Sequence, residues 1–200
     1  MARRYGLASD NLISADLVTA DGNFRNVSKT QHPDLFWGLR GGGGNFGVVT
    51  SLEYQLHAVG PVTGGIVAYP MEQAKEALRL FRDFTTNAPD ELASDFVLIT
   101  MPDRTPVAGM VVCYTGPIEE GERLLRPLKT FAPILMDTIG PMAYTSVQRL
   151  VDDFYPKGLQ NYWKSSFLGE ISNGAIDTIL YHCANRPSPM LRSNQMIHLI

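Results

Sequence analysis

Arg40-Gly41-Gly42-Gly43-Gly44-Asn45-Phe46-Gly47-Val48-Val49-Thr50 is the most informative stretch of this 200-residue sequence. Its four consecutive glycines carry no Cβ atom, so the main chain there can adopt positive φ angles and come close to a flat or charged ligand. Gly42, Gly44 and Gly47 also match the G-x-G-x-x-G fingerprint of dinucleotide-binding folds. Because that fingerprint needs a strand before the glycines and a helix after them, the flanking residues determine its meaning.

The flanking residues predict the opposite order of elements. Residues 33–40 have a pattern typical of a short helix, whereas residues 48–56 alternate and begin with β-branched side chains, which is typical of a strand. The order helix, glycines, strand argues against a nicotinamide-dependent Rossmann enzyme. We interpret the glycines as bare main chain that lies close against some other ligand.

A hairpin precedes this stretch and completes a small antiparallel α+β unit. Residues 12–20 and 23–27 predict two strands, joined by Asp21-Gly22 as a two-residue turn. We place the unit at residues 1–60. Val59-Gly60-Pro61 marks its end, because glycine and proline interrupt regular structure.

Residues 61–200 predict a second domain, an antiparallel sheet with helices on one face. The apolar periodicity changes several times between that of a strand and that of a helix. The strands are expected at residues 64–70, 95–101, 110–115, 134–140, 162–167 and 195–200. The helices are expected at 71–84, 119–129, 144–154 and 172–184, the last with Ser172 as its N-cap. The fold class is therefore α+β.

Composition limits the classes of function. Hydrophobic residues make up 44% of the chain and charged residues 18%, as in a folded globular protein. The net charge of −3 and the scattered basic residues argue against nucleic acid as a partner. No apolar run approaches the roughly 20 residues of a membrane span. Cys113 and Cys183 are expected to be buried thiols, and no Cys/His spacing indicates a metal site.

Both ends of the sequence are unusual for a whole domain. Residues 1–7 contain no leader peptide and read directly as structured sequence, and residues 197–200 end inside an apparent strand. We therefore expect a piece of a longer protein. Neither the compartment, for which the cytoplasm is the default, nor the oligomeric state follows from these residues.

Three motifs, taken in order and at their spacing, resemble the FAD-linked oxidase family. They are residues 4–12, 18–22 and 34–50. More narrowly, the sequence is similar to the berberine bridge enzyme-like group with its vanillyl-alcohol-oxidase-type, or PCMH-type, FAD-binding domain. Residues 158–168 and 186–189 also resemble the substrate domain of bacterial members.

The resemblance implies a different role for each of the two predicted domains. Residues 1–60 would be the second subdomain of the FAD-binding domain, and residues 61–200 part of the substrate domain. Family members use FAD to take a hydride from a small-molecule substrate, at a carbon that bears oxygen or nitrogen. They then pass the electrons to O2 or another acceptor.

The resemblance also implies which residues contact the FAD. Asp10 and Asn11 match an Asp-Asn pair of the family near the cofactor, although a turn or a helix-capping pair is an equally good interpretation. The other expected cofactor-binding residues lie in or directly after the glycine stretch: Gly43, Gly44, Asn45, Gly47, Val48 and Val49. Main-chain N–H groups can satisfy anionic and carbonyl oxygens at close range, which fits this assignment.

The sequence departs from the family pattern at both ends. The diphosphate-binding loop and the residues of covalent attachment, a His and often a Cys, lie upstream of the Arg-x-Tyr-Gly-Leu motif, where this sequence begins. The C-terminal segment that closes the site is also absent. We therefore expect an incomplete oxidoreductase. The alternative is a non-catalytic remnant or interaction module that keeps the fold without binding flavin.

Candidate catalytic residues lie in the predicted substrate domain. Tyr162 and Lys164 alternate on the expected strand 162–167, so both would point to one face, where they could polarise a substrate. The alternative is that both are ordinary strand residues. Met101 falls near a substrate position of the family, with core packing as the alternative. Phe36 and Trp37 are expected to be core aromatics beneath the glycines.

Overall fold

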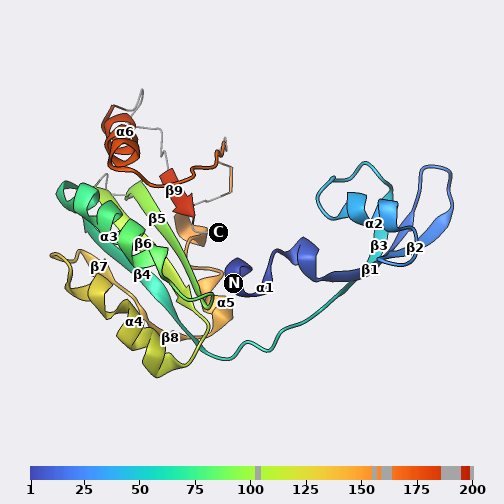
Figure 1. Cartoon of the computed structure of the whole chain (residues 1–200), viewed down its shortest axis with the longest axis horizontal. Helices are drawn as coiled ribbons and strands as arrows, with labels where there is room; N and C mark the ends of the chain where they lie inside the picture. The colour runs from blue at the N-terminus through green and yellow to red at the C-terminus, as the bar shows by residue number, and fades with distance from the viewer. Residues whose placement is uncertain (102–104, 155–156, 159–163, 186–194, 199–200) are drawn as a thin grey trace. The chain divides into compact units, whose positions relative to one another are not determined.

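The computed structural model describes residues 1–101, 105–154, 157–158, 164–185 and 195–198. The chain forms two compact units, Met1–Ala58 and Val59–Ile200, each with its own sheet (Figure 1). Tyr162, one of the two candidate catalytic residues, lies outside the described residues. Which part of an oxidoreductase each unit represents stays a prediction.

The first unit is a three-stranded antiparallel sheet covered by one helix. Its strands are β1 (Leu12–Val18), β2 (Phe24–Ser28) and β3 (Val48–Tyr54), in the order β2-β1-β3. Two short helices, α1 (Ala2–Tyr5) and the 3-10 helix η1 (Ala8–Asn11), precede β1. Helix α2 (Pro33–Leu39) packs over β1 and β2, and the core consists of Leu12, Ala15, Leu17, Val27 and Phe36.

The hairpin between β1 and β2 is one residue longer than expected. Thr19 N donates to Asn23 O at 3.0 Å, and Gly22 N donates to Thr19 O at 2.9 Å, so residues 20–22 form a three-residue loop. Gly22 has φ 77°, the left-handed conformation that such loops require at their last position. The prediction of a two-residue turn was therefore wrong, although Gly22 has the predicted role of reversing the chain.

Helix α2 separates the two aromatic residues that were expected to share the core. Phe36 is 3% exposed and faces the sheet, whereas Trp37 is 77% exposed. Consecutive residues on a helix point about 100° apart, and α2 buries only one narrow face. The expectation for Phe36 is thus confirmed, and that for Trp37 was wrong.

The second unit is a larger antiparallel sheet. Its strand order is β7-β4-β6-β5-β9, and β8 also pairs with β4. The long central strands are β4 (Val62–Pro70), β5 (Leu92–Thr100) and β6 (Pro106–Tyr114). The short outer strands are β7 (Met136–Asp137), β8 (Gly140–Met142) and β9 (Gln195–His198). All pairs are antiparallel, which confirms the predicted α+β class.

Two amphipathic helices, α3 (Ala74–Thr86) and α4 (Ile118–Thr130), cover one face of this sheet (Figure 1). The 3-10 helix η2 (Met71–Gln73) precedes α3. Tyr69 of β4 is fully buried, and its hydroxyl donates to Leu128 O of α4 at 2.6 Å. Lys129 Nζ lies 3.0 Å from Asp137 Oδ2 and donates to Ile139 O at 2.7 Å, so the end of α4 is fixed to the strands beside it.

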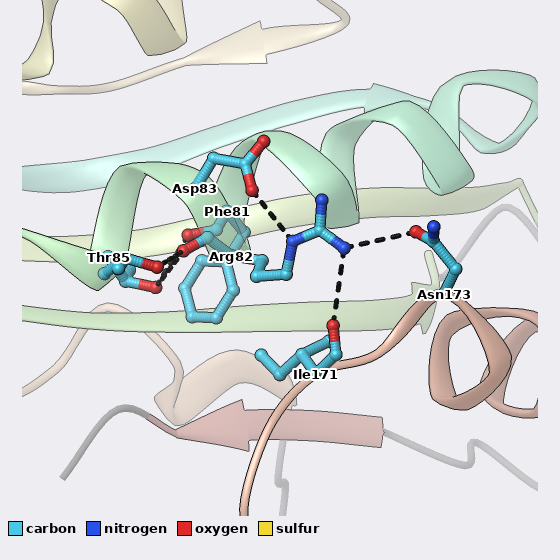
Figure 2. A network of polar contacts seen from close by, with 7 residues as sticks. Phe81, Arg82, Asp83, Thr85, Ile171 and Asn173 are labelled. Carbon is cyan, nitrogen blue, oxygen red and sulfur yellow. Dashed lines mark hydrogen bonds and ion pairs between the residues drawn. The ribbon is translucent and has the colours of Figure 1, made fainter.

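Helix α6 (Asn173–Ala184) packs against α3. Figure 2 shows Arg82 of α3 at this junction, where Nη1 donates to Asn173 Oδ1 at 3.1 Å and to Ile171 O at 3.5 Å. Near the other end of α3, Lys75 Nζ lies 2.6 Å from Asp177 Oδ1. Ser172 accepts from Ala175 N at 3.2 Å, as predicted for an N-cap.

Three predicted elements differ in the structure. The expected strand 134–140 is interrupted: β7 ends at Asp137 and β8 begins at Gly140, because Asp137 Oδ1 accepts from Ile139 N and turns the chain. Residues 144–154 form only a one-turn helix, α5 (Tyr144–Val147), and a 3-10 turn, η3 (Asp152–Phe154). This segment contains several β-branched residues, which weaken a helix.

The expected strand 162–167 was wrong over its described part, since residues 164–168 have no regular structure. A strand needs a neighbouring edge for its main-chain hydrogen bonds. Here β7 and β8 occupy the outer edge of β4, and β9 occupies that of β5. The outer edges of the long strands β4 and β5 are therefore already paired.

Within the described ranges, no helix is long and apolar enough to cross a lipid bilayer. The same residues contain no group of three His, Cys, Asp or Glu side chains that could hold a metal ion. Cys113 and Cys183 are both buried, as expected.

Candidate functional site

The glycine stretch forms an exposed loop between α2 and β3. Gly42 N donates to Gly38 O at 2.8 Å, which adds a last turn to the helix. Asn45 Nδ2 donates to Gly42 O at 3.1 Å and closes the loop from the other side. The amides of Gly43, Gly44 and Asn45 donate to no group in the described part of the chain. The loop therefore presents three consecutive main-chain donors to its surroundings.

The glycines of this stretch have two different roles. A Cβ atom on Gly42 would lie 2.6 Å from the Phe46 ring, and one on Gly47 would meet the Val18 carbonyl, so internal packing requires both glycines. By contrast, a Cβ on Gly44 would meet nothing within 4 Å, and one on Gly43 only Asn45 Nδ2 at 4.0 Å. The inner face of the loop is thus packed on Phe46, and its outer face is open.

Asp10 fixes the base of the loop. Its Oδ2 accepts from Leu7 N at 2.9 Å and caps η1, while its Oδ1 lies 3.0 Å from Arg40 Nη2. Arg40 Nε also donates to Ser9 O at 2.6 Å. Because Arg40 directly precedes Gly41, these contacts hold η1 against the start of the glycines. The capping interpretation of Asp10 agrees with this geometry, and its contact with FAD stays a prediction.

Asn11 is engaged entirely within the first unit. Its Nδ2 donates to Tyr5 O at 2.7 Å and to Leu7 O at 2.9 Å, which leaves Oδ1 as acceptor. His57 Nε2 lies 2.7 Å from that Oδ1, so Nε2 must carry the proton. The His57 ring also stacks on Tyr5, with centroids 4.2 Å apart. Asn11 therefore joins the beginning of the unit to its end, and a role in FAD binding would have to come from its main chain.

Val48 and Val49 begin β3 directly after the loop. They are 70% and 38% exposed, and Leu52, further along the strand, is 51% exposed. Every residue of β3 is exposed, because α2 covers β1 and β2 but not β3. The exposed main-chain donors of the loop are thus followed by an exposed apolar strip, a combination that suits a ligand with polar oxygens and a flat apolar ring.

The candidate site residues of the second unit do not have the arrangement that the sequence predicts. Met101 follows β5, is half-buried and donates its main-chain N–H to Thr105 O at 2.8 Å. Lys164 is exposed and lies outside any strand, so the argument that placed it beside Tyr162 on one strand face does not hold. A catalytic role for Lys164 stays a prediction without a defined neighbour.

The face of the larger sheet turned away from α3 and α4 carries two neutral titratable groups. Burial raises the pKa of the Cys113 thiol and that of the Tyr144 hydroxyl. Helix α5 lies over this face, since a Cβ atom on Gly64 would be 2.9 Å from Val147 Cγ2. Both groups are therefore protonated near neutral pH, and Cys113 is not an activated nucleophile.

Sequence reasoning missed two residues that shape the loop, Arg40 and Phe46. Phe46 stands inside the glycine stretch, where a lone aromatic is a signal for a packing contact. Arg40 pairs with Asp10 across 30 residues of sequence, and no local pattern indicates such a contact. Both residues shape the loop from beneath, so neither needs to touch a ligand itself.

No model of a protein family matches the chain, but relatives are found by sequence. An FAD-linked oxidoreductase of Dictyostelium discoideum is 30% identical over 189 residues, which cover 93% of this chain and 40% of that protein. The chain is thus similar, over nearly its whole length, to part of an FAD-linked oxidoreductase. It spans well under half the length of this relative, so the activity of a whole protein is inferred separately below.

Solved structures show the same similarity. The 6-hydroxy-D-nicotine oxidase of Arthrobacter nicotinovorans matches with a TM-score of 0.70 at 29% identity, over 78% of this chain and 35% of that one. A berberine bridge enzyme-like protein of Arabidopsis thaliana matches with a TM-score of 0.70 at 27% identity, over 95% of this chain and 42% of that one. The Dictyostelium relative is named as FAD-linked, and nothing in the comparisons favours a non-catalytic module.

Proposed function

We propose that this chain contributes part of the cofactor site and part of the substrate domain of an FAD-dependent oxidoreductase. The reaction is hydride transfer from a small-molecule substrate to the flavin, followed by transfer of electrons to O2 or another acceptor. One observation carries the proposal: the outer face of the glycine loop is bare main chain, whose N–H groups donate to no group among the residues that the structure describes, and an exposed apolar strand follows directly.

The residues present fit the cofactor. The amides of Gly43, Gly44 and Asn45 can donate to oxygen or nitrogen acceptors of FAD, because no side chain stands between them and a ligand. Val48 and Val49 offer apolar contact next to these donors. Gly47 lets β3 start close against β1, where a side chain would collide with the Val18 carbonyl. When bound, FAD supplies the hydride acceptor.

The second unit would present its sheet to the substrate. Met101 at the end of β5 is the substrate-contacting residue of this proposal, and Tyr162 and Lys164 are the candidates for polarising the substrate. Hydride transfer is favoured when a protein group accepts the proton that the substrate loses, or binds the charge that develops on it. Lys164 could supply such a positive charge only if its segment approaches the substrate on binding.

FAD titration of the purified chain tests the cofactor site. We expect weak binding by the 200 residues and no yellow protein on purification, because the chain spans about 40% of the first relative's length. Gly44→Val should abolish the binding that remains, since the new side chain points outward and blocks the loop without disturbing its packing. Gly169→Val is the matched control, because its side chain also meets nothing within 4 Å.

Flavin fluorescence gives the affinity, and circular dichroism shows whether each variant folds. Equal FAD affinity of the chain and of Gly44→Val would remove the glycine loop from the cofactor site. Failure of the chain to bind FAD at any attainable concentration would contradict the proposal as a whole.

A further inference from the structure

We propose that Phe24 stacks against a flat nitrogen heterocycle of FAD, and that Asp16 accepts a hydrogen bond from an N–H group of the same ring. The inference rests on the proposed function and deepens it, because it adds two residues to the cofactor site. It starts from the strand register of the first unit, which connects the strand after the glycine loop with the opposite edge of the sheet.

The register places three apolar side chains in one row across this sheet. Val18 of β1 is the direct partner of Phe24 in β2 and of Val48 in β3. Residues directly opposite each other share a face, and neighbours along a strand point to opposite faces. Leu17, the neighbour of Val18, is fully buried in the core that Phe36 of α2 completes. The row of Phe24, Val18 and Val48 therefore lies on the sheet face that points away from α2.

This row is open to a ligand. Phe24 is 65% exposed and Val48 is 70% exposed, while Val18 between them is half-buried. Neighbouring strands lie about 4.8 Å apart, so a row across three strands is about 10 Å long. An aromatic ring beside two branched aliphatic side chains offers a surface on which a flat ring system can stack.

Continuity with the glycine loop indicates which ligand covers the row. Val48 directly follows Gly47, and a Cβ atom on Gly47 would collide with the Val18 carbonyl, so the end of the loop lies close against β1 beside the row. A ligand that accepts from the loop amides can therefore extend over Phe24. FAD is the ligand proposed for these amides, and it contains two flat nitrogen heterocycles, the flavin and the adenine.

A polar group lies next to the row on the same face. Asp16 is two residues before Val18 on β1, so both side chains point to one side of the sheet. Its Oδ1 accepts from Nδ2 of its direct partner Asn26 at 2.7 Å. Within the described residues, Oδ2 accepts no hydrogen bond. A carboxylate has about four acceptor positions, so Asp16 can also accept from an N–H group of a ring that stacks on the row.

Three ligands test the row and identify the ring that occupies it. FMN contains the flavin without adenine, ADP contains adenine without the flavin, and FAD contains both. Each is titrated into the 15N-labelled chain, and the amide signals of β1, β2 and β3 are followed by NMR. The variants are Phe24→Ala, Phe24→Tyr and Asp16→Asn. The matched controls are Phe167→Ala, at a residue that is 90% exposed, and Asp153→Asn, at an exposed residue of η3.

We expect FAD to shift the signals of Val18, Phe24 and Val48. Phe24→Ala should weaken FAD binding about tenfold or more, because stacking on an aromatic side chain is lost. Phe24→Tyr should retain most of the affinity, and Asp16→Asn should lose about threefold or more. Both controls should bind as the unaltered chain does, and the spectra also show that each variant is folded. Phe24→Ala should weaken either FMN or ADP by the same factor as FAD, which identifies the ring on the row.

The outcomes separate this inference from the proposed function. If FAD binds and Gly44→Val weakens it while Phe24→Ala does not, the row is not part of the site and the proposed function stands. Unchanged binding by Asp16→Asn removes Asp16 from the site. Signals of the row that move on dilution without ligand would show that a second copy of the chain covers it, which also overturns the inference. If the chain binds no FAD at all, both proposals fail.

Discussion

The ring of Phe46 occupies the space in which a side chain at Gly42 would lie. A Cβ atom there would be 2.6 Å from Phe46 Cε2 and 2.5 Å from the Gly38 carbonyl oxygen. Gly38 itself packs on the same ring, with a hypothetical Cβ 2.7 Å from Phe46 Cζ. Phe46 also contacts the core of the first unit. The open face of the loop therefore depends on one aromatic ring that supports it from below.

Substitutions of two neighbouring glycines should consequently have opposite effects. Gly42→Ala should lower the free energy of unfolding by about 1–3 kcal/mol, because the added methyl group overpacks the contact with Phe46. Gly44→Ala should leave stability unchanged or raise it by up to about 1 kcal/mol, since its methyl group meets open space and restricts the unfolded chain. Urea denaturation measures both values. Equal effects of the two substitutions would mean that Phe46 does not support the loop as described.

The Asp10–Arg40 pair should be energetically coupled but weak. Both side chains are partly exposed, at 51% and 28%, and solvent screens such pairs. We expect a coupling energy of about 0.3–1 kcal/mol in a double-mutant cycle of Asp10→Ala and Arg40→Ala. Asp10→Ala should cost about 1 kcal/mol by itself, since it also removes the cap of η1. Added salt should reduce the coupling and leave the cost of the lost cap largely unchanged.

Arg82 should hold the start of α6 in place. Replacing it with alanine removes the donors to Asn173 Oδ1 and Ile171 O that Figure 2 shows. We expect faster amide hydrogen exchange in residues 173–178 and no change in α3, because an anchor at one end of a helix controls local opening. Arg79→Ala is the matched control, because Arg79 pairs with Glu76 of its own helix. Similar exchange of α6 in both variants would show that Lys75–Asp177 and apolar packing suffice.

Much of the fold follows from local patterns in the sequence. The helix before the glycines and the helices α3 and α4 were predicted from periodicity, because each buries one apolar stripe. The strand after the glycines was predicted from its alternation and its β-branched start, although the structure leaves all its residues exposed. The family resemblance was confirmed as well. Prediction failed where long-range partners decide the structure. Residues 164–168 were expected to belong to a strand, but they have no regular structure.

The candidate site was also predicted only in part. The glycines in the sequence indicate a close approach of the main chain. Only the structure shows that internal packing requires Gly42 and Gly47, whereas Gly43 and Gly44 face outward.

Stability should fall at alkaline pH, and Cys113 should account for the first part of the fall. Burial raises the pKa of Cys113 above its ordinary value of 9.0, so above about pH 9 the unfolded chain loses this proton before the folded protein does. Deprotonation then favours the unfolded state, and the free energy of unfolding decreases by up to about 1.4 kcal/mol per pH unit for one group. Below that pH the contribution is fully present.

Urea denaturation at several pH values between 9 and 10 measures this slope, before Tyr69 and Tyr144, whose pKa values burial also raises from 10.0, begin to contribute. Cys113→Ala should flatten the curve in this interval. Val111→Ala, on the same strand and without a titratable group, should lower the whole curve and keep its shape. An unchanged slope in Cys113→Ala would mean that the thiol titrates alike in the folded and unfolded states, and that this face of the sheet is more open to water than its burial indicates.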